Sequence, residues 1–242
     1  MNIKNISILG FALIIKFNNT ILNQKLQTKP IKEPTKERIN NKQNNLFQDK
    51  IILKNWFKIE IDKVLDVYKK TNNNKKRLNI IDETIEVALD YDNISSGVIG
   101  DSWEASNNDN KLNYLRLFRT HLGFYILDLM EPYSGQAYKL ANVTFNRSTK
   151  IYSIKMKIIL TNNSIVGFFT NNLISTTFEF KKYKNEFKMV DFLPKILLNS
   201  LSKVDSKKNE FYSILKENNY NLKVLNDYLL EKNDSAFRKY KL

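Results

Sequence analysis

Few side chains in this sequence are of the types that carry out chemistry, and the first is its single histidine. His121 is the only imidazole among 242 residues, and there is no cysteine. A histidine can act as a general base or as a pH-sensitive group, but catalysis also needs a nucleophile or a carboxylate placed beside it. No motif in the sequence places such a partner next to His121. We therefore expect His121 to be a structural residue and not a catalytic one.

Other chemistries are excluded by composition. Without cysteine there are no disulfides, thiolate metal sites, iron–sulfur clusters or cysteine nucleophiles, and one histidine excludes multi-histidine metal centres. The sequence also contains no glycine-rich phosphate loop and no Gly-x-Ser-x-Gly nucleophile elbow. We expect no catalytic residues, no metal and no cofactor.

Four acidic residues lie close together in the sequence, at Asp90, Asp92, Asp101 and Glu104. Paired carboxylates could serve as acid and base or hold a cation, but this spacing fits no EF-hand loop. Helix caps and a solvated face explain them better. Core packing is likewise expected of three aromatic side chains on which a ligand could otherwise stack: Trp103, Phe118 and Tyr133.

The chain is strongly basic, with 39 Lys and Arg against 25 Asp and Glu, a net charge of +14. A basic body attracts nucleic acid or anionic lipid headgroups. No arginine-rich run or arginine–aromatic motif of a nucleic-acid site stands out. One open alternative is therefore a basic, membrane-tethered module that binds nucleic acid or protein.

The N-terminus has the pattern of an export segment. Behind Lys4, the run Ile6–Ile15 is apolar apart from one serine, which is the length of a secretory h-region and too short to span a membrane. We expect residues 1–26 to be a signal peptide or an N-terminal membrane anchor; the alternative is an apolar strand or helix of a cytosolic protein. Residues 27–45 hold two prolines and many charges, so we expect a flexible basic linker.

The spacing of apolar residues predicts helices before and after a block of strands. A period near 3.6 residues indicates helices, here over residues 46–70, 75–89, 92–99, 108–131, 210–216 and 222–231. Alternation with a period of two, typical of an antiparallel sheet with one buried face, predicts strands at Gln136–Asn146, Ile151–Thr161, Leu173–Tyr183 and Phe187–Leu193. Segregated helices and strands make this an α+β fold with a single curved, four-stranded, mainly antiparallel sheet.

The predicted sheet and one helix each have an apolar face. The sheet face carries Ile154, Met156, Ile158, Phe178 and Phe180, and the helix stripe carries Phe118, Leu122, Tyr125 and Leu129. If these faces pack flush they form a core, and if they stand apart they enclose a long apolar pocket. Periodicity alone leaves both arrangements open.

Several segments, in order, resemble the signatures of the MlaC family, the periplasmic phospholipid carriers of the lipid-asymmetry pathway, also called toluene-tolerance auxiliary proteins. The stretch Asp90–Trp103 resembles the family's pattern of an aspartate and an aromatic residue followed by leucine–glycine–x–x–tryptophan, although Ile99 stands before Gly100 here. Phe187–Asp191 resembles its tryptophan–lysine–valine–x–aspartate strand, with phenylalanine in place of tryptophan. The match continues at Leu115, Phe118-Arg119, Leu122, Tyr133-Ser134-Gly135, Ser202, Lys208–Phe211 and Leu222–Asn233.

The resemblance implies a fold and a set of ligand contacts. The fold is an NTF2/cystatin-like sheet wrapped by helices around an apolar cavity for acyl chains, formed by residues 46–233 and followed by a basic C-terminal tail, 234–242. The lipid-binding residues are then expected to be Phe118, Leu122, Tyr125, Leu129, Val143, Ile154, Met156, Ile158, Phe178 and Phe180.

The resemblance also implies a function. The chain would be an exported, periplasmic carrier with phospholipid as cargo, not as a cofactor, and with no nucleic acid as partner. It would shuttle lipid between an inner-membrane ABC transporter complex with a lipid-binding ring and an outer-membrane lipoprotein complex. Besides the basic module above, an enzyme with His121 or Asp191 acting at the cavity mouth remains an alternative.

Overall fold

A computed structural model describes residues 36–131, 133–159, 173–184, 186–196, 199–200 and 202–242. A boundary after Asn40 separates a first unit from a second, Asn41–Leu242, to which the following description applies. The expected signal peptide or anchor lies outside the described residues. Among the described residues, no helix has both the length and the apolar character needed to cross a membrane.

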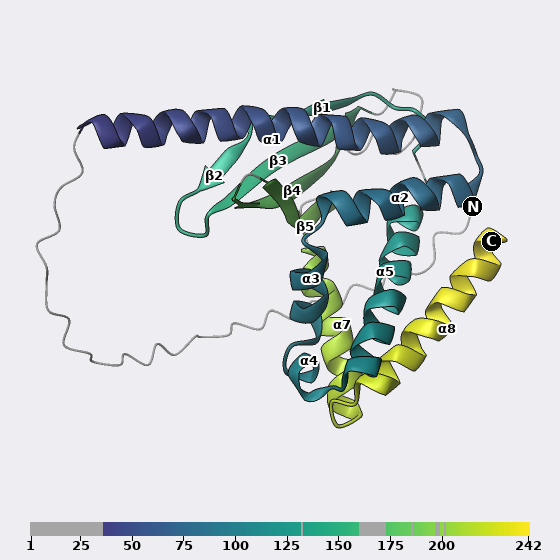
Figure 1. The fold of residues 1–242 in the computed structure, drawn as a ribbon. Coiled ribbons are helices and arrows are strands. Elements are labelled where there is room, and N and C mark those ends of the chain that lie inside the picture. Colours follow the sequence, from purple (N-terminus) through teal and green to yellow (C-terminus); the bar gives the residue numbers. More distant parts are fainter. Residues whose placement is uncertain (1–35, 132, 160–172, 185, 197–198, 201) are drawn as a thin grey trace, which may run out of the picture. The chain divides into compact units, whose positions relative to one another are not determined.

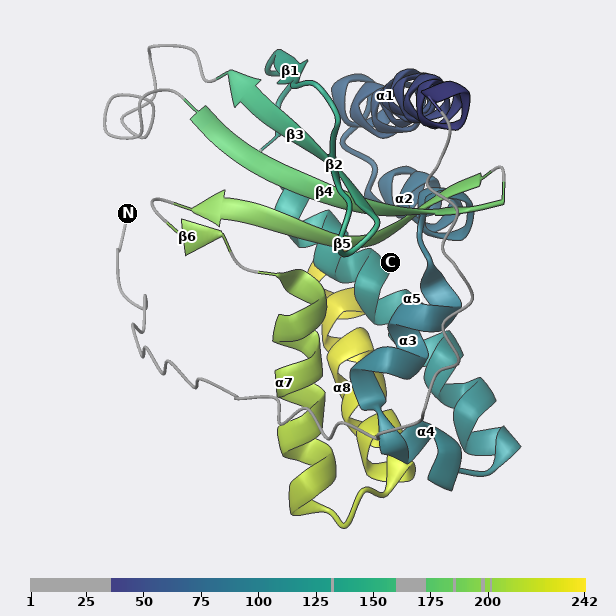
Figure 2. The same ribbon diagram turned by 90° about the vertical axis from the view of Figure 1, so that its left-hand side faces the viewer.

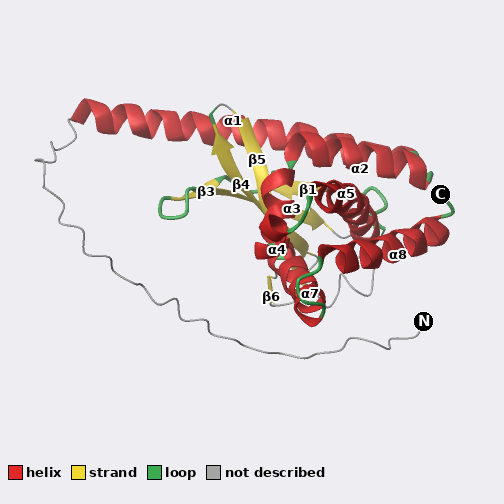
Figure 3. Cartoon of the chain, turned by 60° about the horizontal axis from the view of Figure 1, so that its bottom comes forward, coloured by secondary structure: helices red, strands yellow, loops and turns green. Residues whose placement is uncertain are grey.

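Helices and strands are segregated along the chain, which confirms the α+β class (Figure 1). The helices before the sheet are α1 (Lys36–Lys70), α2 (Asn74–Ala88), α3 (Tyr91–Ile99), α4 (Asp101–Ala105) and α5 (Asn108–Met130). The strands are β1 (Tyr138–Leu140), β2 (Thr144–Asn146), β3 (Ile151–Ile159), β4 (Leu173–Tyr183), β5 (Glu186–Ile196) and β6 (Asn199–Ser200). Two helices follow, α7 (Lys203–Glu217) and α8 (Leu222–Tyr240). Figure 3 shows the strands as one group among these helices.

The strands form one antiparallel sheet in the order β1-β3-β4-β5-β6, with β2 also paired to β3. Between β4 and β5 the register shifts, because Glu179 lies opposite Asp191 whereas Phe180 lies opposite Met189. Val190 is therefore an extra residue, a β-bulge, in β5. A bulge bends its strand and increases the local twist, so β5 curves where it meets the helices.

The apolar face of the sheet packs against α1 at β4. The Phe57 ring centroid lies 4.8 Å from that of Phe178 and 5.3 Å from that of Phe180, and Trp56 meets Phe180 edge-on at 6.1 Å. Figure 2 shows α1 at the upper right, beside the upper strands, and α3, α5, α7 and α8 gathered below the sheet. The expected apolar face is thus confirmed; α1 packs on it at β4, and α5 meets it at β5, where the Tyr125 ring lies 6.4 Å from that of Phe192.

The sheet has more strands than the expected four. The segment predicted as one strand, Gln136–Asn146, forms two short strands that both pair with β3. Between them Val143 is buried in the core, which takes the chain out of the regular ladder. At the other edge, β5 continues beyond Leu193 to Ile196 and pairs with β6.

Two segments that were expected to lie outside the folded domain, the linker and the C-terminal tail, contain helix. Helix α1 begins at Lys36, so part of the expected flexible linker, residues 27–45, is helix, and residues 27–35 lie outside the description. Helix α8 runs to Tyr240 and so includes most of the expected C-terminal tail, 234–242. Its end is held because Phe237 meets Phe124 edge-on at 4.9 Å and Tyr240 stacks on the same ring at 6.1 Å.

One residue of the acidic stretch stands at a helix N-cap position, but its side chain makes no hydrogen bond to the helix backbone. Asp90, not Asp92, is the residue before α3, and its carboxylate accepts hydrogen bonds from Asn93 and Tyr183. Gly100, with φ at +54°, ends α3 in a conformation that glycine adopts without strain. In the described part of the chain, no three carboxylate or imidazole groups lie close enough together to hold a metal ion.

A candidate ligand pocket

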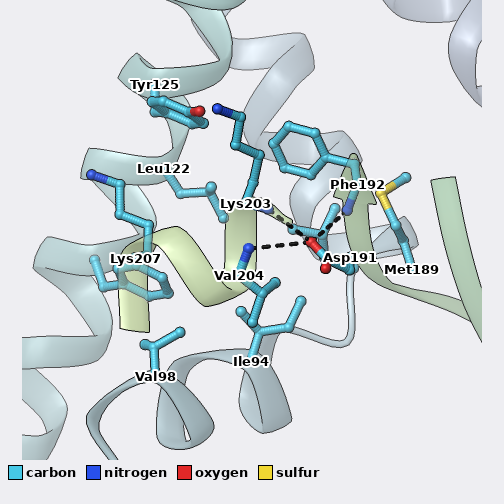
Figure 4. A pocket seen from close by; sticks show the side chains of 12 residues that line it. Ile94, Val98, Leu122, Tyr125, Met189, Asp191, Phe192, Lys203, Val204 and Lys207 are labelled. Atoms are coloured by element: carbon cyan, nitrogen blue, oxygen red, sulfur yellow. Dashed lines mark hydrogen bonds between the residues drawn. The ribbon is translucent and has the colours of Figure 1, made fainter. Parts of the chain in front are cut away.

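One pocket lies between β5 and the helices α3, α5 and α7 (Figure 4). Its empty space, which includes the solvent at its open mouth, is about 410 Å³. It is lined by Leu89, Ile94, Val98, Phe118, Leu122, Tyr125, Met189, Asp191, Phe192, Lys203, Val204 and Lys207.

Helical spacing explains the apolar wall. Phe118, Leu122 and Tyr125 stand at positions i, i+4 and i+7 of α5, which puts them on one face of that helix. The Phe118 ring stacks on Tyr114 at 5.5 Å and meets Phe211 of α7 edge-on at 5.7 Å. This buried aromatic cluster fixes the distance between α5 and α7 and so sets the width of the pocket.

Asp191 joins the sheet to α7. One oxygen of its carboxylate accepts backbone N–H groups of Phe192 at 2.7 Å and of Lys203 and Val204 at 3.2 Å each. The last two belong to the first turn of α7, whose N–H groups have no partner within the helix. Asp191 therefore acts as a helix cap that holds α7 against β5, one residue after the bulge.

Two lysines of α7 form the polar end of the pocket. The ammonium groups of Lys203 and Lys207 lie 5.8 and 5.4 Å from the centre of the Tyr125 ring. Lys207 also donates to Glu210 at 2.8 Å, whereas no carboxylate pairs with Lys203 within the described ranges. An apolar cavity with an uncompensated cation at its mouth suits a ligand with an apolar body and an anionic end.

His121 stands behind this polar end and accepts from Lys207, with 2.9 Å between its Nε2 and the lysine Nζ. Burial, together with the positive charge of Lys207, lowers the pKa of His121 to about 4. The imidazole is therefore neutral at neutral pH, which is the form that can accept this hydrogen bond.

We predict that His121→Gln makes the protein less sensitive to acid. In the unfolded chain the histidine takes up a proton near its ordinary pKa of ~6.5, whereas the folded chain takes it up only near the lowered pKa. The wild type should therefore lose on the order of 3 kcal/mol of unfolding free energy between pH ~6.5 and ~4 that the variant does not lose. Urea unfolding of both proteins at several pH values measures this difference. If the unfolding free energies of the two proteins changed with pH in parallel, the result would contradict a buried, neutral His121.

Only part of the predicted lipid-contacting set meets at this pocket. Phe118, Leu122 and Tyr125 line it. The other seven do not, and whether they contact lipid stays a prediction. Val143, Ile154, Met156 and Phe180 are buried, Ile158 and Phe178 are partly buried, and Leu129 is 41% exposed.

The expected cavity lay between the α5 stripe and the apolar face of β3 and β4. The pocket lies between the same α5 stripe and the next strand, β5, whose Met189 and Phe192 pair with Phe180 and Phe178 and so belong to the same sheet face. On β4 itself, Trp56 and Phe57 of α1 pack against Phe180 and Phe178. Periodicity missed the contributions of α3, β5 and α7. The one available signal was the pair Lys203 and Lys207, four residues apart at the start of a helix.

Comparison with known proteins gives a family match and a structural match. A family model described as "MlaC protein" matches residues 59–231. The phospholipid-binding protein from Ralstonia solanacearum, solved in complex with a phospholipid, is similar in fold, with a TM-score of 0.58 and 14% identity over 74% of this chain and 96% of that one. No significant match was found among curated proteins. The structural similarity confirms the expected fold.

Proposed function

This chain belongs to the MlaC family, and from that premise we propose that it is a phospholipid carrier that holds an acyl chain in the pocket between β5, α3, α5 and α7. The observation that carries this proposal is the chemistry of the pocket. Its walls are mainly apolar, and its polar end carries Lys203 and Lys207. The phospholipid bound to the Ralstonia solanacearum protein of similar fold supports the same assignment.

The energetics favour burial of the chain over recognition of the headgroup. Each methylene removed from water is worth ~0.8 kcal/mol, so an acyl chain supplies most of the affinity. An exposed lysine–phosphate pair is worth about 0–1 kcal/mol. The apolar wall therefore retains the lipid, and Lys203 orients the phosphate toward the mouth. We assign the pocket one acyl chain, which would lie along the apolar wall and extend through the open mouth.

The proposed cellular role follows the family. The chain is exported by residues 1–26 to the periplasm, where it takes phospholipid as cargo and makes or breaks no bond. Its partners are an inner-membrane ABC transporter complex with a lipid-binding ring and an outer-membrane lipoprotein complex. Since cargo must be released as well as held, a pocket that opens at its mouth suits this exchange better than a closed cavity.

The direct test is to look for the cargo. We expect gentle native mass spectrometry of the purified full chain, followed by solvent extraction, to show about one phospholipid per protein. Protein stripped of lipid should take it up again from phosphatidylglycerol vesicles. A protein that carries no lipid when purified and takes none from vesicles would contradict the proposal.

A further inference from the structure

The sheet face that points away from the core carries a row of lysines. In the antiparallel register Lys139 lies opposite Lys157, Lys157 opposite Ser175, and Ser175 opposite Lys195. Directly opposite residues of antiparallel strands point to the same face. Lys139, Lys157 and Lys195, which we call the lysine row, therefore run across β1, β3 and β5 on one face.

Nothing in the fold requires this row. No carboxylate pairs with any of its three lysines in the described part of the chain. Lys139 and Lys157 are like charges directly opposite each other, an arrangement that destabilises a sheet. The buried side chains Ile154 and Phe180 belong to the other face. A charge array that costs stability and supports no packing indicates an external anionic partner.

We propose that the lysine row is a docking surface for an anionic lipid bilayer. Lys155 stands two residues from Lys157 and adds a further positive charge to the same face. Single-stranded nucleic-acid sites combine cations with stacking aromatic rings, but the neighbouring positions on this face, Thr177 and Leu193, hold no aromatic residue and no arginine, and the next position along β4 is the carboxylate Glu179. The array fits a surface of repeated phosphates.

The row and the pocket share strand β5 but belong to opposite faces of it. Strand β5 carries Phe192 in the pocket wall and Lys195 in the row. Residues three apart on a strand point to opposite faces, so a bilayer held by the row would leave the pocket on the other side of the sheet. The docking rests on charge alone and goes beyond the proposed function, because it holds whatever the pocket contains.

The expected binding is weak and sensitive to salt. Each lysine near an anionic membrane strengthens adsorption by a factor of about five, and the attraction is screened within about 10 Å at 0.1 M salt. Three lysines therefore favour contacts that form and dissociate readily, as a carrier needs.

The test compares two triple variants of the full chain with equal net charge. One is Lys139→Gln/Lys157→Gln/Lys195→Gln. The control, Lys75→Gln/Lys76→Gln/Lys208→Gln, removes exposed lysines of α2 and α7 that have no side-chain partner among the described residues. Sedimentation is measured with vesicles of phosphatidylcholine, with and without about one third phosphatidylglycerol, at about 0.05 M and about 0.3 M salt. The apolar run Ile6–Ile15 is the same in all three proteins.

We expect the wild type to bind the anionic vesicles at low salt and to lose most binding at high salt. The row variant should bind at least tenfold more weakly, and the control within about threefold of the wild type. Three results would each overturn the proposal: equal losses of vesicle binding in both variants, a row variant that binds as well as the wild type, or a wild type that does not bind anionic vesicles. Lipid extracted from the same preparations reports on the cargo separately, so row variants that keep their lipid test docking and not carriage.

Discussion

Val204→Trp will exclude phospholipid from the pocket while leaving the fold intact. Val204 lies in the first turn of α7, lines the pocket and is only partly buried, so a larger side chain can extend into the open space. If the indole displaces roughly four methylenes of an acyl chain, binding weakens by about 3 kcal/mol, a factor of more than 100. The hydrogen bond from the backbone N–H of residue 204 to the Asp191 carboxylate does not involve the side chain, so the substitution leaves it in place.

The measurement is phospholipid per protein after purification, together with the unfolding free energy. Val87→Trp is the matched control, because Val87 lies on α2, is 49% exposed and does not line the pocket. We expect the control to keep its lipid and both variants to unfold within ~1 kcal/mol of the wild type. A Val204→Trp protein that is destabilised by ~1–3 kcal/mol, with its lipid unchanged, would instead indicate an overpacked core at this position.

Phe180→Ala should have the opposite effect, with a large loss of stability and an unchanged lipid content. Phe180 is fully buried, packs against Trp56 and Phe57 of α1, and is not among the residues that line the pocket. Truncation of a buried aromatic ring leaves a cavity and costs ~3–5 kcal/mol. The folded fraction should carry as much phospholipid as the wild type, because Trp56 and Phe57 of α1 pack against this ring.

Urea unfolding and lipid extraction measure both effects. Phe47→Ala serves as the control, because Phe47 lies on the same helix as Phe57 but is 61% exposed, so its truncation should cost less than ~0.5 kcal/mol. If Phe180 instead lined a lipid cavity, its truncation would cost little stability and would change the amount of lipid bound. That result would restore the cavity position expected from the sequence.

Much of the fold could be predicted because periodicity reports directly on backbone geometry. The change from a period of 3.6 to a period of two lies between the helix that ends at Met130 and the strand that begins at Ile151. Alternation within β3 and β4 identified the buried sheet face, and Ile154 and Phe180 are fully buried there. Errors occurred where tertiary contacts extend an element, as where Phe124 holds the end of α8.

The site was harder to predict because periodicity says which side of an element is apolar but not what covers it. Phe57 and Leu122 both belong to apolar helix stripes, and the same sheet face could have met either one. The bulge at Val190 has no local sequence signal, yet it positions Phe192 and Asp191 at the pocket.

The sequence by itself determined the α+β class, the order of the elements, the apolar stripe of α5 and, through the order of its motifs, the MlaC family. The tertiary structure alone decided that α1 packs against Phe178 and Phe180 of β4 and that the pocket opens beside β5. It also brought Lys203 and Lys207 to Tyr125, far from them in the chain. The physical reason is that local periodicity specifies the face of each element, whereas a pocket depends on the spacing between elements that are distant in sequence.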